Sequence, residues 1–171
     1  MSKLFYDVPA EGYDELYGEE QRVKYKLVFD KLGYCSSSLL DIGCGVGLLA
    51  EYLKNAGFNG IYVGVDIDLE RIRYAKKSLN VNDYVVADAH HLPFRDKCFQ
   101  LSTIFTVIHL LEIRKAVKEA LRVSQKVIVI TLLKKRGDLE KNLIEEIQRS
   151  GKIVKLESRE SKDYIFIAYV D

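Results

Sequence analysis

A turn rich in glycine follows a short apolar run near residue 40. Asp41 closes the run, and Gly43, Gly45 and Gly47 stand at alternate positions after it. Glycine lets the backbone turn tightly and lets a ligand come close to main-chain N–H groups. A helix expected to begin near Val46 would point its positive N-terminal end at the same ligand. The pattern suits a ligand held against the backbone, although glycines also serve ordinary turns.

Carboxylates also close the next two apolar runs. Asp66 comes 19 residues after Gly47 and can accept both hydrogen bonds of a ribose diol. Asp88 can accept a hydrogen bond from an adenine amino group, Ile67 can pack on the adenine face, and Phe105 ends the fourth run beside the same expected pocket. Ordinary loops rarely place acids at successive strand ends, so the sequence predicts a nucleoside-type ligand.

A dinucleotide-binding oxidoreductase is the nearest alternative for such a turn. Its fingerprint is Gly-x-Gly-x-x-Gly, in which the third glycine packs the helix on the strand. Here that position holds Leu48, the third glycine comes early at Gly47, and Asp41 precedes the turn. A chain of 171 residues also leaves no room for a separate substrate domain.

Strand-like and helix-like segments alternate along the whole chain. The predicted strands are 38–42, 61–65, 84–87, 99–105, 126–133, 152–156 and 164–170. The predicted helices are 13–32, 48–56, 69–79, 113–121 and 139–147. In the first helix the expected core contacts are Leu16, Val23, Leu27, Val28 and Leu32. Asp68 is expected to serve only as the N-terminal cap of the third helix.

This alternation predicts an α/β fold with helices on both faces of a parallel sheet. The last two strands are too close for a crossover helix and should pair antiparallel. We therefore expect a doubly wound, seven-stranded, mostly parallel sheet with a C-terminal antiparallel hairpin. Residues 1–171 form one domain, in which a helical segment (1–37) lies over the ligand site of a core (38–171). Ligands of such sheets bind at the carboxyl ends of the strands.

Four segments together resemble the motifs of the class I S-adenosylmethionine-dependent methyltransferases, which have a Rossmann-like core. The segments are Asp41–Gly47, Val63–Asp68, Ala87–Phe94 and Phe99–Leu111. The third has an acid, a small residue and then Leu-Pro-Phe, as many members do. The resemblance covers about residues 39–133, and the terminal hairpin is similar to that of the family sheet.

The resemblance implies S-adenosylmethionine as the cofactor and methyl transfer as the reaction. Gly43 and Gly45 would lie under the methionine part, Asp66 would bind the ribose, and Asp88 with Ala89 the adenine. The full set of predicted cofactor-binding residues is Asp41, Gly43, Cys44, Gly45, Asp66, Ile67, Asp88, Ala89, Phe105 and Tyr13. Tyr13 is placed over the methionine end.

Catalysis needs little from the side chains, because the sulfonium of this cofactor is already a reactive methyl donor. His109 is the candidate base, but its apolar setting favours a structural role, and no catalytic residue is assigned. His90 and His91 are expected to shape the loop after Asp88. The stretch 104–107 lacks the Asn/Asp-Pro-Pro-Tyr/Phe motif of family members that methylate adenine or glutamine amino groups.

Composition excludes several other classes. The net charge of +1 gives no global attraction to nucleic acid or membrane, although a local basic patch would suffice for nucleic acid. No apolar run approaches the roughly 20 residues of a membrane span, and the N-terminus turns polar too soon for a signal peptide, so a cytoplasmic protein is expected. Cys35, Cys44 and Cys98 lack the spacing of a metal site or disulfide framework.

The methyl acceptor is harder to predict. The chain offers little to grip a small substrate, and similar translation-related methyltransferases use a small zinc-binding activator on the edge strand, here 84–87. We therefore expect RNA or a translation-related protein as acceptor, with such an activator as partner. A metabolite methyltransferase and a non-catalytic cofactor-binding subunit are the alternatives. The run 134–136 (Lys-Lys-Arg) can contact phosphates, although a solvated loop is the simpler interpretation.

Overall fold

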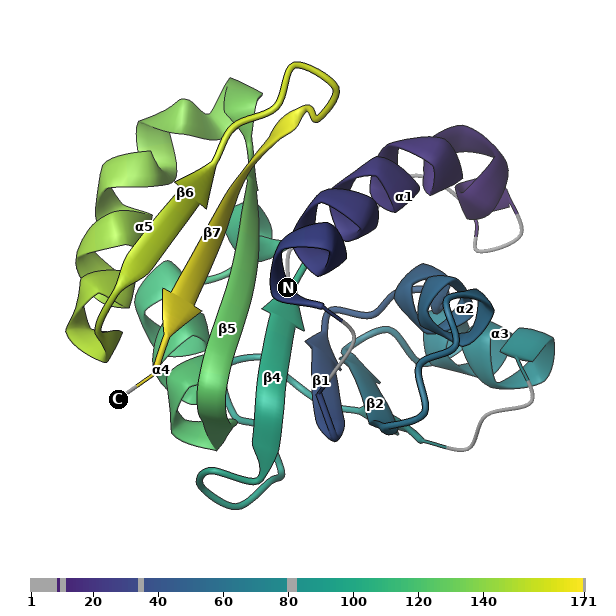
Figure 1. Ribbon diagram of the computed structural model, residues 1–171. Coiled ribbons are helices and arrows are strands. Elements are labelled where there is room, and N and C mark those ends of the chain that lie inside the picture. The colour runs from purple at the N-terminus through teal and green to yellow at the C-terminus, as the bar shows by residue number, and fades with distance from the viewer. Residues whose placement is uncertain (1–8, 10–11, 34–35, 80–82, 171) are drawn as a thin grey trace.

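A seven-stranded sheet organises the molecule (Figure 1). The computed structural model describes residues 9, 12–33, 36–79 and 83–170. The strands are β1 (Ser38–Ile42), β2 (Ile61–Asp66), β3 (Tyr84–Val86), β4 (Phe99–Ile104), β5 (Ser124–Leu133), β6 (Ile153–Leu156) and β7 (Asp163–Tyr169). Their order across the sheet is β3-β2-β1-β4-β5-β7-β6, and β7 runs antiparallel to both of its neighbours. The predicted α/β sheet with its C-terminal hairpin is confirmed.

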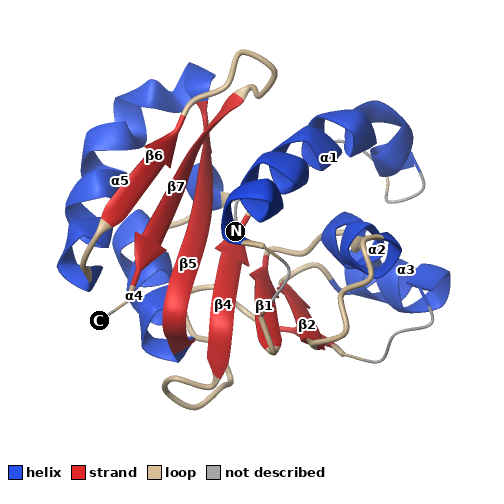
Figure 2. Ribbon diagram, in the orientation of Figure 1, coloured by secondary structure: helices blue, strands red, loops and turns tan. Residues whose placement is uncertain are grey.

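Helices cover both faces of this sheet (Figure 2). They are α1 (Tyr13–Leu32), α2 (Leu48–Asn55), α3 (Leu69–Leu79), α4 (Ile113–Val123) and α5 (Glu140–Ile147). Short 3-10 turns follow strands or helices at η2 (Ile108–Leu110), η3 (Lys134–Leu139) and η4 (Gln148–Ser150). In Figure 2, α4 and α5 lie on one side of the sheet, and α2 and α3 lie on the other with α1.

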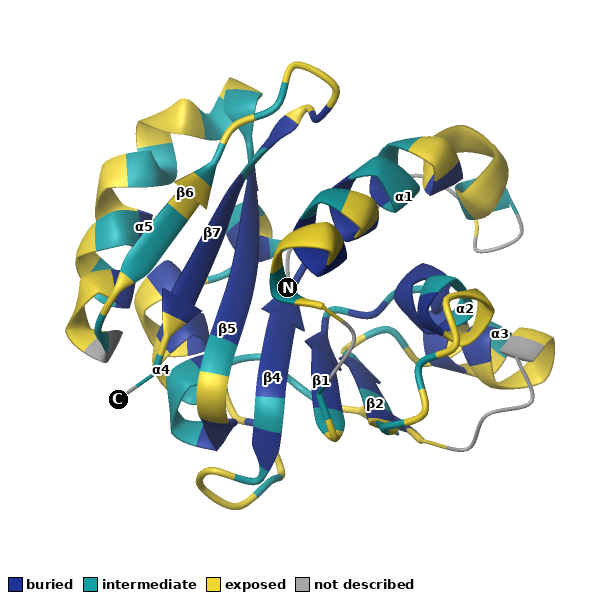
Figure 3. Ribbon diagram, viewed as in Figure 1, coloured by how far each residue is buried: buried dark blue, intermediate teal, exposed yellow. Residues whose placement is uncertain are grey.

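The core has two layers, one on each face of the sheet, because successive side chains of a strand point to opposite faces. Leu39 packs in the core cluster that contains α1, α2 and α3 residues, whereas Leu40 packs with α4 and α5. In β7, Ile165 and Ile167 join the first cluster and Phe166 joins the second. Both faces of β4, β5 and β7 are therefore buried along most of their length (Figure 3), as the near-continuous apolar runs predict.

The predicted boundaries agree closely with the structure. The first helix has the predicted bounds, but Leu16 is 66% exposed, so its prediction as a core contact is wrong. Strand β5 begins at Ser124, two residues before the predicted start, and β3 is the edge strand, as predicted. Cys35 lies outside the described residues. Within the described part of the chain, no helix is both long and apolar enough to cross a membrane.

Candidate functional site

A cavity of about 330 Å³ opens at the carboxyl ends of β1, β2, β3 and β4. All ten predicted cofactor-binding residues line it, and their binding roles remain predictions. Several other lining residues were not predicted from the sequence, among them Gln21, Tyr25, Arg71 and Leu111. We call this space the cofactor cavity.

The glycine turn forms the floor of the cofactor cavity with left-handed backbone angles. The φ angles of Gly43, Gly45 and Gly47 are 76°, 55° and 89°, a region that side chains with a Cβ rarely adopt. A Cβ on Gly43 would also come within 2.6 Å of a methyl carbon of Val107. Glycine is therefore needed at Gly43 both for the turn and for the close packing beneath it.

Three N–H groups of this turn bond within the protein, whereas the glycine pattern suggests that they face a ligand. Those of Gly43 and Cys44 donate to the carbonyl of Val65 at 2.8 and 2.9 Å. The N–H of Gly45 donates to the carboxylate of Asp66 at 2.8 Å. The turn folds back against the end of β2, whose last two residues accept these three hydrogen bonds. The turn therefore brings its backbone close to the cavity without leaving these three N–H groups unpaired.

Asp66 connects the glycine turn to the residues that follow β2. One carboxylate oxygen accepts from Gly45, and the other accepts from the N–H of Asp68 at 2.9 Å. Each oxygen of a carboxylate has two acceptor positions, so one on each oxygen is left for a diol. Burial raises the pKa of Asp66. Asp68 in turn accepts from the N–H groups of Glu70 and Arg71, which confirms its predicted role as a helix cap.

Asp88 and His90 form a hydrogen-bonded pair on the cavity wall just after β3. The N–H and the Nδ1 of His90 lie 2.9 and 2.6 Å from the same oxygen of Asp88. The Nε2 of His90 accepts from the N–H of Glu112 at 3.0 Å, so the ring proton is on Nδ1. His90 thus ties the loop after β3 to the start of α4, in agreement with the predicted loop-shaping role. The second oxygen of Asp88 faces His91 at 3.7 Å.

Asp41 is buried beneath the glycine turn. The hydroxyls of Tyr62 and Thr103 each donate to its carboxylate at 2.9 Å. Burial nevertheless dominates and raises its pKa from 3.8 to about 6. With Asp66, Asp68 and Asp88 it places four acids on the cavity wall.

Helix α1 closes one side of the cavity. The guanidinium of Arg71 lies 4.9 Å from the ring centroid of Tyr13, and the Tyr25 ring meets the Phe105 ring edge-on with centroids 4.8 Å apart. Burial raises the pKa of Tyr13 to about 12. Arg71 was missed because its position on α3 is that of an ordinary solvated side chain in the sequence pattern. Its distance of five positions from Asp66 is the signal that could have found it.

A second, larger cleft of about 800 Å³ adjoins the cofactor cavity. The two share Tyr13, Gln21 and Leu110. His109 lines this second cleft and not the cofactor cavity. Its Nδ1 is buried without a hydrogen-bond partner in the described part of the chain, and burial, followed by the nearby charge of Arg136, lowers its pKa.

Comparison with known proteins identifies the family. A family model described as a methyltransferase domain matches residues 40–127. The chain belongs to this methyltransferase domain family. The match begins in β1, covers the glycine turn and the strand ends that carry Asp66 and Asp88, and ends in β5.

Two relatives by sequence illustrate the range of the family. The chain is 35% identical over 123 residues to an uncharacterised protein of Methanocaldococcus jannaschii, covering 71% of this chain and 46% of that protein. It is 29% identical over 124 residues to demethylmenaquinone methyltransferase of Thermotoga maritima, covering 69% and 54%. The chain thus spans about half the length of these relatives.

Solved structures show the same fold at low sequence identity. A putative S-adenosylmethionine-dependent methyltransferase of Methanococcus maripaludis has a TM-score of 0.74 at 17% identity, covering 93% of this chain and 89% of that one. A TehB-like methyltransferase of Corynebacterium glutamicum has a TM-score of 0.73 at 18% identity, with coverages of 95% and 98%. The class I methyltransferase fold expected from the sequence is therefore confirmed.

Proposed function

We propose that this chain is an S-adenosylmethionine-dependent methyltransferase whose acceptor is a small molecule. The observation that carries the proposal is the acidic cofactor cavity at four adjacent strand ends of a methyltransferase domain. Four carboxylates and one guanidinium, that of Arg71, line it. Such a wall suits a ligand with a sulfonium and an ammonium group, because opposite charges attract more strongly in a partly desolvated cavity than in water.

The lining residues also match the remaining parts of the cofactor. Asp66 keeps one acceptor position on each oxygen for the ribose diol, and Asp88 keeps an oxygen for the adenine amino group. Exposed Ile67 offers an apolar surface for the adenine ring. Arg71, beneath Tyr13, is the cation that we assign to the cofactor's carboxylate. When bound, the cofactor supplies an electrophilic methyl group; the chain holds it and excludes water around it.

A small-molecule acceptor is favoured over RNA or a translation-related protein, the acceptors expected from the sequence. Relatives include demethylmenaquinone methyltransferase of Thermotoga maritima. They also include malonyl-[acyl-carrier protein] O-methyltransferase of Pseudescherichia vulneris, 34% identical over 94 residues, 54% of this chain and 36% of that protein. Their names support the metabolite alternative. Neither name supports the zinc-binding activator on β3, which stays a prediction.

Calorimetry tests the cofactor assignment. Asp66→Ala removes the diol acceptor and the bond that holds Gly45, so S-adenosylmethionine affinity should fall by at least about tenfold. Glu70→Ala, an exposed acid four residues away, is the matched control and should bind normally. Equal affinity in both variants would remove the central assignment.

Transfer of a radioactive methyl group to cell extract tests the acceptor. The labelled extract is separated into RNA, protein and small-molecule fractions, and label is expected in the last. Label in RNA or protein would overturn the acceptor part of the proposal. Intact cofactor binding with no labelled product in any fraction would favour a non-catalytic cofactor-binding subunit.

A further inference from the structure

The second cleft is the place where a methyl acceptor can reach the cofactor cavity. A methyl group passes directly between donor and acceptor atoms, so the acceptor must lie in a space that opens onto the donor. The two spaces meet at Tyr13, Gln21 and Leu110. We call the second space the acceptor cleft. Its walls come from α1, from the η2 and η3 turns, and from the turn between β6 and β7.

The acceptor cleft is strongly cationic. Its charged lining residues are Glu20, Lys134, Lys135, Arg159 and Lys162, four cations and one anion. The whole chain carries a net charge of only +1, so positive charge is concentrated here. The neighbouring cofactor cavity has the opposite sign. The two adjoining spaces would therefore favour ligand groups of opposite charge.

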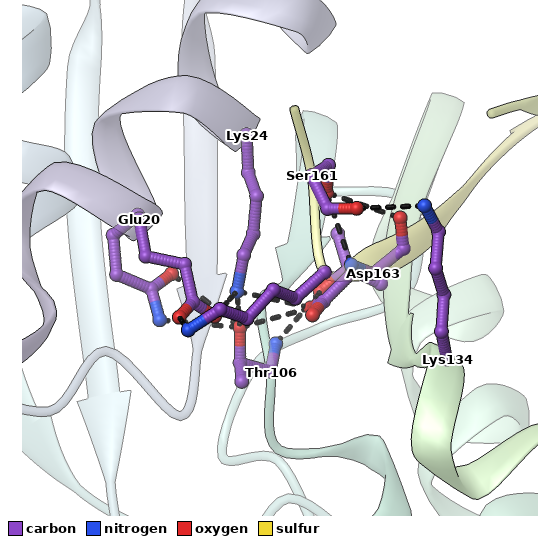
Figure 4. Close-up of polar contacts among 9 residues, drawn as sticks. Glu20, Lys24, Thr106, Lys134, Ser161 and Asp163 are labelled. Atoms are coloured by element: carbon purple, nitrogen blue, oxygen red, sulfur yellow. Dashed lines mark hydrogen bonds and ion pairs between the residues drawn. The ribbon is translucent and has the colours of Figure 1, made fainter. Parts of the chain in front are cut away.

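Two of the four cations have structural partners. Lys162 forms an ion pair with Glu20 at 2.7 Å. The ammonium of Lys134 donates to the carbonyls of Ser158 and Ser161, each at 2.7 Å. Figure 4 shows Lys134 reaching toward Ser161 at the β6–β7 turn. These contacts fix the turn against η3 and α1.

The other two cations remain available to a ligand. Lys135 and Arg159 are exposed, and neither forms an ion pair with any residue in the described ranges. They stand on different walls, Lys135 in η3 and Arg159 in the β6–β7 turn. A guanidinium binds carboxylate or phosphate through two parallel hydrogen bonds, and a lysine adds a point charge. Because both line the acceptor cleft, an anionic group bound there would have cations on two of its walls.

We propose that the acceptor cleft binds the anionic group of a small methyl acceptor through Lys135 and Arg159. The inference rests on the proposed function, and it assigns the acceptor to carboxylate- or phosphate-bearing metabolites. Of the basic run at 134–136, only Lys135 keeps the phosphate-contact role considered for it. Lys134 binds carbonyls and Arg136 pairs with Asp138 at 3.1 Å.

The surroundings of the acceptor cleft agree with this assignment. Thr106 lies on its wall and is held by buried Lys24, whose ammonium is 2.8 Å from the Thr106 hydroxyl (Figure 4). His109 lines the same wall, and burial lowers its pKa, which disfavours a further positive charge there. A fixed, preformed pocket reduces the ordering cost of binding.

An RNA phosphate is a different source of negative charge. Binding along a strand requires cations spread over a track, whereas these two line a single cleft that adjoins the cofactor cavity. The geometry therefore favours a small anion, and RNA becomes an outcome of the test.

The test separates the small-molecule extract by anion exchange before methyl transfer. Acceptor activity should appear in the retained, anionic fraction. The Lys135→Gln/Arg159→Gln variant should raise the acceptor KM by at least about tenfold with unchanged S-adenosylmethionine affinity. The matched control is Lys77→Gln/Lys118→Gln, two exposed lysines that line neither cavity, and its KM should not change.

A binding experiment gives a second readout that needs no identified acceptor. Protein loaded with S-adenosylhomocysteine is titrated with citrate or with inorganic pyrophosphate, and amide NMR shifts are followed. We expect the amide signals near Lys135, Arg159 and His109 to shift on titration. These shifts should be absent in the double variant. Tighter binding of citrate would indicate a carboxylate-bearing acceptor, and tighter binding of pyrophosphate would indicate a phosphate-bearing one.

The outcomes separate this inference from the proposed function. Activity only in the unretained fraction or in RNA, or a double variant with normal KM, overturns the anionic assignment and leaves the methyltransferase intact. Absence of anion binding together with absence of retained acceptor activity also overturns it. Loss of S-adenosylmethionine binding in the unaltered protein would instead overturn the proposed function.

Discussion

The ammonium of Lys24 lies 3.1 Å from the carboxylate of Asp163, and neither side chain is exposed to solvent. The pair joins α1 to the first residue of β7 (Figure 4). Asp163 also accepts from Thr131 at 2.8 Å and from Thr106 at 3.2 Å. Because α1 supplies Tyr13 and Gln21 to both cavities, this buried ion pair fixes a wall that they share.

Removal of one charge should therefore cost more than removal of both. Lys24→Met leaves Asp163 buried without its cation and should lower the free energy of unfolding by about 3–5 kcal/mol. Lys24→Met/Asp163→Leu should lose less than the single variant. Urea unfolding measures both changes. A double variant at least as unstable as Lys24→Met would contradict the ion-pair account.

Glycine at position 43 should be required for two separable reasons. Gly43→Ala places a Cβ at a φ of +76° and against Val107, with an expected loss of about 2–4 kcal/mol in unfolding free energy. Gly43→Ala/Val107→Ala relieves the contact and keeps the backbone strain, so stability should return in part. Gly137→Ala is the control, since a Cβ there meets open space, and it should change stability by less than about 1 kcal/mol. Full recovery in the double variant would show that the backbone angle contributes nothing.

Cofactor affinity should depend on pH through Asp41. Its pKa in the folded chain, about 6, lies above its ordinary value of 3.8. The stability that its protonation contributes is therefore complete below about pH 4 and is lost as the pH rises through 6. A bound cation favours the ionised carboxylate, so at pH 5 the cofactor must displace a proton.

Calorimetry between pH 5 and pH 8 checks this dependence. S-adenosylmethionine affinity should fall as the pH drops below about 6, by up to about tenfold per pH unit. S-adenosylhomocysteine lacks the sulfonium charge and should show a shallower fall. Asp41→Asn should reduce the difference in pH dependence between the affinities for the two ligands. Parallel profiles for the two ligands in the unaltered protein would contradict the electrostatic explanation.

The two adjacent histidines should behave differently. His90→Ala removes the bridge between Asp88 and the N–H of Glu112, so S-adenosylmethionine affinity should fall by about tenfold. The side chain of His91 is 80% exposed, and His91→Ala should bind normally. Equal losses in both variants, measured by calorimetry, would indicate a general disturbance of the loop and not the bridge.

The sequence predicts the parts of this molecule that depend on local pattern. Apolar alternation and glycine stops locate the strands within a few residues, and Asp41, Asp66 and Asp88 follow because parallel strands end at one edge. These features need no knowledge of distant contacts. The left-handed φ of Gly43 and the helix cap at Asp68 are likewise local features, although the packing of Gly43 against Val107 is not.

The sequence does not predict features that depend on distant partners. Lys24 has the pattern of a solvated helix residue and pairs with Glu20 one turn away on α1, yet its ammonium also meets Asp163 of β7 and Thr106 after β4. Leu16 shows the opposite behaviour: its apolar side chain predicts a core contact, but the buried face of α1 carries Gln21, Tyr25 and Val28 and leaves Leu16 exposed. Arg159 lines the same cleft as Lys135 because the β6–β7 turn folds back beside η3. Such charge arrangements arise from tertiary packing.

The Lys24–Asp163 pair also bears on the order in which the chain folds. Loop-closure entropy grows with the length of chain enclosed, so contacts between distant segments form late. The pairing of β7 with β5 positions Asp163, which argues that α1 acquires its buried anion afterwards. We therefore expect the Rossmann-like core to assemble first and α1 to dock last, and amide hydrogens of α1 to exchange before those of β4 and β5. Ligand binding, which needs the wall that α1 provides, would then report on the last step of folding.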